Sequence, residues 1–114
     1  MGWFSRRSGG AGGAVRPGTL RSANTADLAH LRAFAISRHG VEAFIEPRTT
    51  VTEATLLLVA ADGEWTRRRI PGPNAAEEFA REHGVPLYDP VSVGYPQRMR
   101  EWTARRKAEE RASD

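Results

Sequence analysis

Cysteine is absent from this 114-residue sequence, and its absence excludes several kinds of site at once. Disulfide bonds, thiolate zinc sites, iron–sulfur clusters and thiol nucleophiles all require cysteine. A chain without cysteine is typical of the cytosol, so we expect a cytoplasmic location. No apolar run approaches the ~18 residues that span a membrane, and we therefore expect no transmembrane segment.

Lysine is almost absent as well, since Lys107 is the only one among 17 basic residues. Lysine-based catalysis therefore has no candidate in the core. Residues 1–23 carry four arginines and no acid, residues 24–94 carry seven arginines and ten acids, and residues 95–114 carry six basic and four acidic residues. The net charge of +3 thus arises in the tails, which argues against a nucleic-acid interface on a slightly acidic body.

The chain is long enough for one domain, flanked by segments with little apolar content. The glycine-rich stretch at residues 9–13 follows no strand-like run and has no lysine after it, so it is typical of a linker rather than a phosphate loop. We predict a disordered Gly/Arg-rich tail over residues 1–23, an α+β domain over residues 24–102, and a charged helical or frayed tail over residues 103–114.

The middle of the chain predicts a β-hairpin. An apolar run over Leu56–Val59 is followed by the dipeptide Asp62-Gly63 and by a second strand over Glu64–Ile70. Asp-Gly between two strand-like runs is a strong hairpin signal, because the turn needs a residue that accepts a positive φ. We expect Gly63 to be that residue.

The remaining elements follow from hydrophobic periodicity and from helix-capping residues. The spacing predicts a helix over Thr25–His39 capped by Thr25, and a second helix that is capped by Asn74 and ends at His83. Pro86 indicates a short edge strand over Val85–Tyr88, because proline cannot donate to a central ladder. The other expected elements are strands over Val41–Glu46 and Val51–Ala60 and a last helix that starts near Pro96. The predicted fold is α+β, a three-stranded antiparallel meander plus a short fourth strand, with helices packed on the sheet, in the order αβββαβα.

The arginine-rich strand provides the main candidate binding site. Alternation along the strand places Trp65, Arg67 and Arg69 on one face, and Arg48 in the preceding turn is expected to assist them. An aromatic ring with arginines can anchor a protein partner, or it can stack a base and hold phosphate. The third possibility is a solvated face whose arginines pair with glutamates across the sheet, for which Glu42, Glu46 and Glu53 are available.

A second candidate site is an alternative pocket near the end of the fourth strand. Its residues would be His83, Tyr88, Asp89 and Tyr95. None of the three histidines has another histidine three or four residues away, so the sequence predicts no metal site. Nucleophile elbows and dinucleotide-binding glycine motifs are also absent, and we expect no cofactor.

The run RHGVEAFIEPRTTVTEATLLLVAADGEWTRRRIPGPNAAEEFA, together with the later VGYPQRMREW, resembles a family of short uncharacterised actinobacterial proteins, some of which carry an oxidoreductase label. The resemblance covers roughly residues 25–105 and implies a bacterial cytosolic protein. It supplies no catalytic residue. We therefore expect a non-catalytic module that binds a protein partner or a second copy of itself. The alternatives are an RNA- or ribosome-associated protein, and a small enzyme or oxidoreductase-associated subunit.

Overall fold

The computed structural model describes residues 24–50 and 53–113. The predicted disordered tail, the first two residues of the predicted second strand and Asp114 lie outside the described residues. In chain order the elements are α2 (Thr25–Ser37), β1 (Glu42–Glu46), β2 (Thr55–Val59), β3 (Trp65–Arg69), α3 (Pro73–His83), β4 (Leu87–Tyr88), α4 (Pro90–Val93) and α5 (Gln97–Ser113). Within the described ranges, no helix combines the length and the apolar character needed to cross a membrane.

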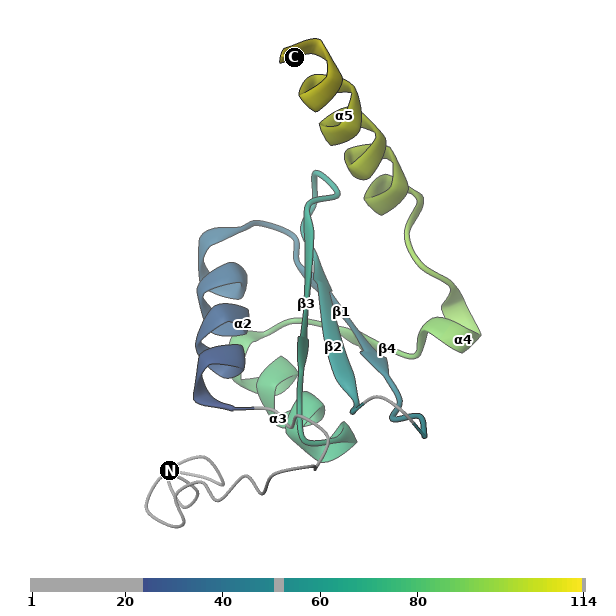
Figure 1. Cartoon of the computed structure of the whole chain (residues 1–114). Helices are drawn as coiled ribbons and strands as arrows, with labels where there is room; N and C mark the ends of the chain where they lie inside the picture. The colour runs from purple at the N-terminus through teal and green to yellow at the C-terminus, as the bar shows by residue number, and fades with distance from the viewer. Residues whose placement is uncertain (1–23, 51–52, 114) are drawn as a thin grey trace, which may run out of the picture.

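The four strands form one sheet in the order β3-β2-β1-β4, which Figure 1 shows nearly edge-on. The β1–β2 and β2–β3 pairs are antiparallel, and the two-residue strand β4 pairs in parallel with β1. The predicted α+β class, the three-stranded meander and the short fourth strand at an edge are thereby confirmed. The structure adds the single-turn helix α4, which was not among the elements predicted from the sequence.

Two helices cover the same face of the sheet, since α2 and α3 lie together on one side in Figure 1. The main core lies between them and the sheet, with Leu31, Phe34 and Phe79 from the helices meeting Ala43 and Leu56 from the strands. Alternation along β1 turns Phe44 to the opposite face, where it joins a second, smaller cluster. We call this second side of the sheet the open face.

Both helices start differently from the predictions, with caps that lie one residue earlier for α2 and two residues earlier for α3. Asn24, not Thr25, caps α2, and it exchanges hydrogen bonds with Asp27 in a capping box. Helix α3 begins at Pro73 after Gly72, so Asn74 is already inside it. Proline suits the first helical position because the backbone donor that it lacks would have no intrahelical partner there.

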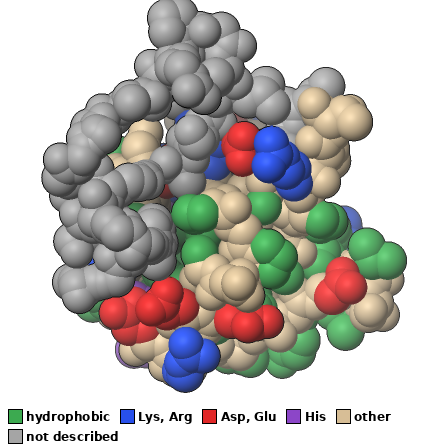
Figure 2. Space-filling model, turned by 90° about the horizontal axis from the view of Figure 1, so that it is seen from below, with side chains coloured by type: hydrophobic (Ala, Val, Ile, Leu, Met, Phe, Trp, Pro, Cys, Tyr) green, Lys and Arg blue, Asp and Glu red, His purple; other side chains and the backbone are tan. Residues whose placement is uncertain are grey.

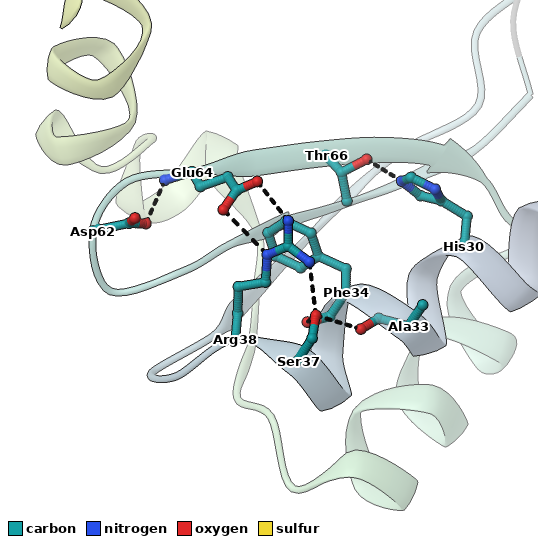
Figure 3. A network of polar contacts seen from close by, with 8 residues as sticks. All are labelled: His30, Ala33, Phe34, Ser37, Arg38, Asp62, Glu64 and Thr66. Carbon is teal, nitrogen blue, oxygen red and sulfur yellow. Dashed lines mark hydrogen bonds and ion pairs between the residues drawn. The ribbon is translucent and has the colours of Figure 1, made fainter. Parts of the chain in front are cut away.

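A polar network fastens α2 to β3 and to the hairpin turn (Figure 3). The Arg38 guanidinium donates two hydrogen bonds, of 3.1 and 2.6 Å, to the carboxylate of Glu64 and a third to the Ser37 hydroxyl. Further along the helix, the His30 ring is hydrogen-bonded to the Thr66 hydroxyl at 2.6 Å. These contacts hold the helix side of β3 in place.

The last helix docks on the tip of the hairpin through its first half. The Thr103 hydroxyl accepts a hydrogen bond from the indole N–H of Trp65, and the Arg105 guanidinium donates to the carbonyl of Asp62, both at 2.9 Å. Contacts with the body therefore extend past the domain boundary predicted at residue 102. From Ala104 to Ser113 the side chains are exposed, and Figure 1 shows this part of α5 projecting from the body.

Candidate functional site

The open face carries a cluster of aromatic and apolar side chains. Its buried members are Phe44, Leu57 and Val59, and Trp65, Tyr88 and Met99 are partly buried against them. The ring of Phe44 lies 5.5 Å from that of Tyr88 and 6.1 Å from that of Tyr95. The face is thus lined by aromatic rings that arrive from β1, from β4 and from the segment before α5.

Glu46, at the end of β1, is the polar centre of the open face. Its carboxylate accepts hydrogen bonds of 2.7 and 3.0 Å from the Arg67 guanidinium, one of 2.6 Å from the Thr55 hydroxyl, and one from the Tyr95 hydroxyl. Burial by itself would raise the pKa of Glu46, but the hydrogen bonds from Arg67, Thr55 and Tyr95 outweigh it and lower the pKa. The carboxylate is therefore ionised at neutral pH.

Tyr95 and Arg67, two of the partners of Glu46, are held in their protonated forms. Burial and the hydrogen bond to Glu46 raise the pKa of Tyr95, so its hydroxyl stays protonated and donates a hydrogen bond to the carboxylate. The hydrogen bond to Glu46 likewise raises the pKa of Arg67. The group is a closed ion pair, with neither a free base nor a free acid at neutral pH.

Trp65 is engaged on two sides. Its indole N–H is bonded to Thr103, and the Arg67 guanidinium lies over its ring, 5.4 Å from the centroid. Trp65 and Arg67 were predicted to share a face, and both contribute to the open face. Trp65 also joins the hairpin to α5, a role that the sequence did not indicate.

The other two arginines of the predicted site contact different parts of the molecule. The Nε atom of Arg69 lies 4.0 Å from the carboxylate of Asp27, in the first turn of α2. Arg48 lies in the turn after β1 and pairs with Glu53 at 3.8 Å. Neither is placed in the Glu46–Arg67 group, so the predicted set of four divides into three separate contacts.

The four residues of the alternative pocket lie in different parts of the structure. Tyr88 and Tyr95 lie on the open face, but His83 stacks on Phe79 of the main core, with ring centroids 4.4 Å apart. Asp89 caps α4 by accepting a hydrogen bond from the backbone N–H of Val91. Alternation along β4 turns Leu87 toward the main core and Tyr88 toward the open face, so the two tyrosines and His83 lie on opposite sides of the sheet.

A strip of exposed apolar side chains borders the open face. We define the apolar strip as Val91, Val93 and Tyr95, which are 85%, 59% and 40% exposed. All three lie in α4 or in the short segment that follows it. Among residues 24–50 and 53–113, no group of three or more acidic or histidine side chains could hold a metal ion.

Three residues of the site gave little signal in the sequence. Thr55 and Arg98 bond to the glutamates of β1, with Arg98 pairing with Glu42 at 2.7 Å, and Thr103 bonds to Trp65. The partners of Arg98 and Thr103 lie 56 and 38 residues away along the chain, and only the pairing of arginines with strand glutamates could be anticipated. Comparisons with protein-family models, with curated proteins and with solved structures gave no match to this chain.

Proposed function

We propose that this chain is a non-catalytic protein-interaction module of the bacterial cytoplasm, and that its partner contacts the open face together with the apolar strip. The observation that carries the proposal is the exposure of Val91, Val93 and Tyr95 next to aromatic rings and a closed ion pair. Exposed apolar patches with polar surroundings mark interaction sites, and aromatic residues are enriched in protein interfaces.

The chemistry of Glu46 supports a binding role over a catalytic one. A general acid or base needs a pKa near the working pH and a free position for a substrate proton. The pKa of Glu46 is lowered, and Arg67, Thr55 and Tyr95 already occupy its carboxylate. The four residues of the alternative pocket are not gathered in one place, so they add no support for an enzyme.

RNA binding is the second candidate, because the open face joins Trp65 and Arg67. Single-strand binders need aromatic faces and cations that are available to the ligand. Here the guanidinium of Arg67 is occupied by Glu46 and also lies over the Trp65 ring. On the end of the molecule drawn in Figure 2, acidic side chains border hydrophobic ones, and the basic side chains in its coloured part form no continuous patch. These features favour a protein partner.

Affinity capture from cells that express the native gene tests the proposal. The immobilised full chain should retain a partner protein after nuclease treatment. The double variant Val91→Asp/Val93→Asp should lose that protein, because charge on the apolar strip opposes its burial. Ile36→Asp is the matched control, since Ile36 is 75% exposed on α2, on the other side of the sheet.

Each outcome bears directly on the proposal. Circular dichroism and thermal melts should show that both variants fold like the parent chain. Loss of all captured protein on nuclease treatment would favour the RNA alternative. Equal capture by Val91→Asp/Val93→Asp and by Ile36→Asp would show that the apolar strip is not the contact surface.

A further inference from the structure

Within residues 24–50 and 53–113, strand β3 lies at the end of the sheet order and pairs only with β2, so its other edge is free of any described strand. The hydrogen bonds from Ala60 to Glu64 and from Ile70 to Ala54 fix the phase of the β2–β3 ladder. In an antiparallel ladder, every second residue directs its N–H and C=O away from the partner strand. Trp65, Arg67 and Arg69 are the residues whose backbone groups face outward.

Little in the described part of the chain occupies these outward groups. The carbonyl of Arg67 accepts a hydrogen bond of 3.2 Å from the guanidinium of its own neighbour Arg68, which is exposed. No other described segment is recorded to bond with the outward backbone groups of β3. An added strand along this edge would displace one exposed hydrogen bond from a side chain and would form a ladder of backbone hydrogen bonds with β3.

The charges along β3 are only partly compensated. Arg67 forms an ion pair with Glu46. Arg68 and Arg69 share the single carboxylate of Asp27, at 3.9 and 4.0 Å. Both distances exceed hydrogen-bonding range, and within the described residues the buried Nε of Arg69 has no hydrogen-bond partner. Three guanidinium groups thus face two carboxylates, with donors left over.

His30 adds no further charge to this edge at neutral pH. Its ring lies 3.4 Å from the Arg68 guanidinium, and burial together with the charges of Arg68 and Arg38 lowers the pKa of His30. The excess of positive charge at this edge therefore comes from the arginines.

The excess of positive charge favours some strands over others as partners for this edge. Two copies of the chain paired edge to edge through β3 would place arginine against arginine, which disfavours a homodimer at this edge. A basic strand is disfavoured for the same reason, and an acidic one is attracted. We propose that the free edge of β3 accepts an extended acidic segment of the protein partner as a fifth strand of the sheet. This inference rests on the proposed function and names the chemistry of its partner.

A model peptide tests the inference on the full chain. The probe is a fluorescein-labelled nine-residue peptide of alternating glutamate and valine, and its binding is followed by fluorescence polarisation. The comparison probes are the same peptide with lysine for glutamate, and nine-nucleotide oligouridylate. The acidic peptide should bind, and on binding the amide protons of Trp65, Arg67 and Arg69 should become protected from hydrogen exchange.

A proline substitution separates strand addition from simple charge attraction. Arg67→Pro and Arg67→Ala both remove the guanidinium, but only proline removes the outward N–H, and it spares the ladder to β2. The peptide should bind Arg67→Pro about tenfold more weakly than Arg67→Ala, as expected for one lost hydrogen bond. Arg68→Gln should weaken binding of the acidic peptide and should not weaken binding of the lysine peptide. Thermal melts should confirm that each variant is folded.

Several results would overturn the inference. These are an acidic peptide that does not bind, equal affinity of Arg67→Pro and Arg67→Ala, or binding that leaves the three amides unprotected. Binding of oligouridylate in place of the peptide would favour RNA as the ligand. Failure of the peptide while affinity capture still retains a protein would refute the fifth strand and leave the interaction module standing.

Discussion

Three hydrogen-bond donors from different elements converge on Glu46, so its carboxylate links these elements to β1. Thr55 comes from β2, Arg67 from β3 and Tyr95 from the segment before α5. A half-buried carboxylate with such partners stabilises the fold only while it is ionised. The sequence allowed the pairing of a strand glutamate with an arginine, but the tyrosine lies 49 residues away and gave no local signal.

The lowered pKa of Glu46 predicts a specific loss of stability in acid. Because the folded-state pKa lies below the unfolded value of about 4.3, the unfolded chain binds the proton first. The contribution of Glu46 is therefore present above about pH 5 and is lost as the pH falls through its folded-state pKa. Glu46→Gln should lower the free energy of unfolding by about 1–2 kcal/mol at pH 7 and flatten its decline below about pH 5.

Urea titrations at several pH values measure this effect. Glu77→Gln is the control, since Glu77 is exposed on α3 and its replacement should change the free energy of unfolding at pH 7 by no more than about 0.5 kcal/mol. An unaltered pH profile in Glu46→Gln would contradict the assigned role of Glu46.

Gly63 is constrained twice, by its backbone and by its neighbours. Its φ is +97°, as the Asp-Gly signal predicted, and a Cβ atom there would lie 2.1 Å from the carbonyl oxygen of Arg98. Gly63→Ala should therefore destabilise the protein by more than the ~1 kcal/mol expected from glycine entropy effects alone, and should lower the melting temperature by at least several degrees. Gly72→Ala is the matched control, because nothing lies within 4 Å of its Cβ position. Equal melting temperatures for the two variants would refute the close packing of α5 on the turn.

At the scale of elements, local sequence patterns predicted which residues share a face better than they predicted where the helices begin. Neighbouring residues of a strand are expected to face opposite sides, and the structure places Ala43 and Phe44 of β1 in different clusters. The helix starts were displaced because Asn24 and Pro73 compete with the neighbouring residues Thr25 and Asn74, and propensity alone does not rank such neighbours. The parallel pairing of β4 with β1 depends on how α3 returns the chain, which no local pattern contains.

The docking of α5 on the hairpin predicts an uneven effect of substitutions along this helix. Met99 packs on the cluster of the open face, whereas Glu101, half a turn further on, is exposed. Met99→Ala should destabilise the protein by about 1–3 kcal/mol, less than a fully buried methionine would, and Glu101→Ala should stay within about 0.5 kcal/mol. Urea unfolding midpoints measure both. A neutral Met99→Ala would indicate that α5 contributes little to the stability of the body.

At the scale of the whole molecule, the candidate site brings together residues from the two separate sites that the sequence predicted. Trp65 and Arg67 came from the arginine-rich strand, and Tyr88 and Tyr95 from the alternative pocket, yet all four lie on the open face. The residue types were therefore recognisable in the sequence. Their grouping was not, because it depends on the strand order β3-β2-β1-β4, which brings the start of the last helix across the sheet.

The distribution of charge along the whole chain predicts where any RNA affinity would reside. Residues 24–94 carry more acids than arginines, whereas residues 1–23 carry four arginines and no acid. Each single-strand phosphate that is neutralised contributes about −0.7 to the slope of log affinity against log salt. Replacing the four N-terminal arginines by glutamine in the full chain should reduce the slope for oligouridylate by up to about 3. The residues replaced are Arg6, Arg7, Arg16 and Arg21.

The matched comparison is Arg67→Gln/Arg69→Gln, which lowers the charge of β3 instead of the tail. Because the proposed ligand of β3 is an acidic protein strand and not phosphate, this variant should leave the slope close to that of the parent chain. Salt titrations of fluorescently labelled oligouridylate measure both slopes. The opposite result, an unchanged slope for the N-terminal variant and a reduced one for Arg67→Gln/Arg69→Gln, would place phosphate on β3. RNA would then replace the acidic protein strand as the ligand of that edge, because the same guanidinium groups cannot serve both.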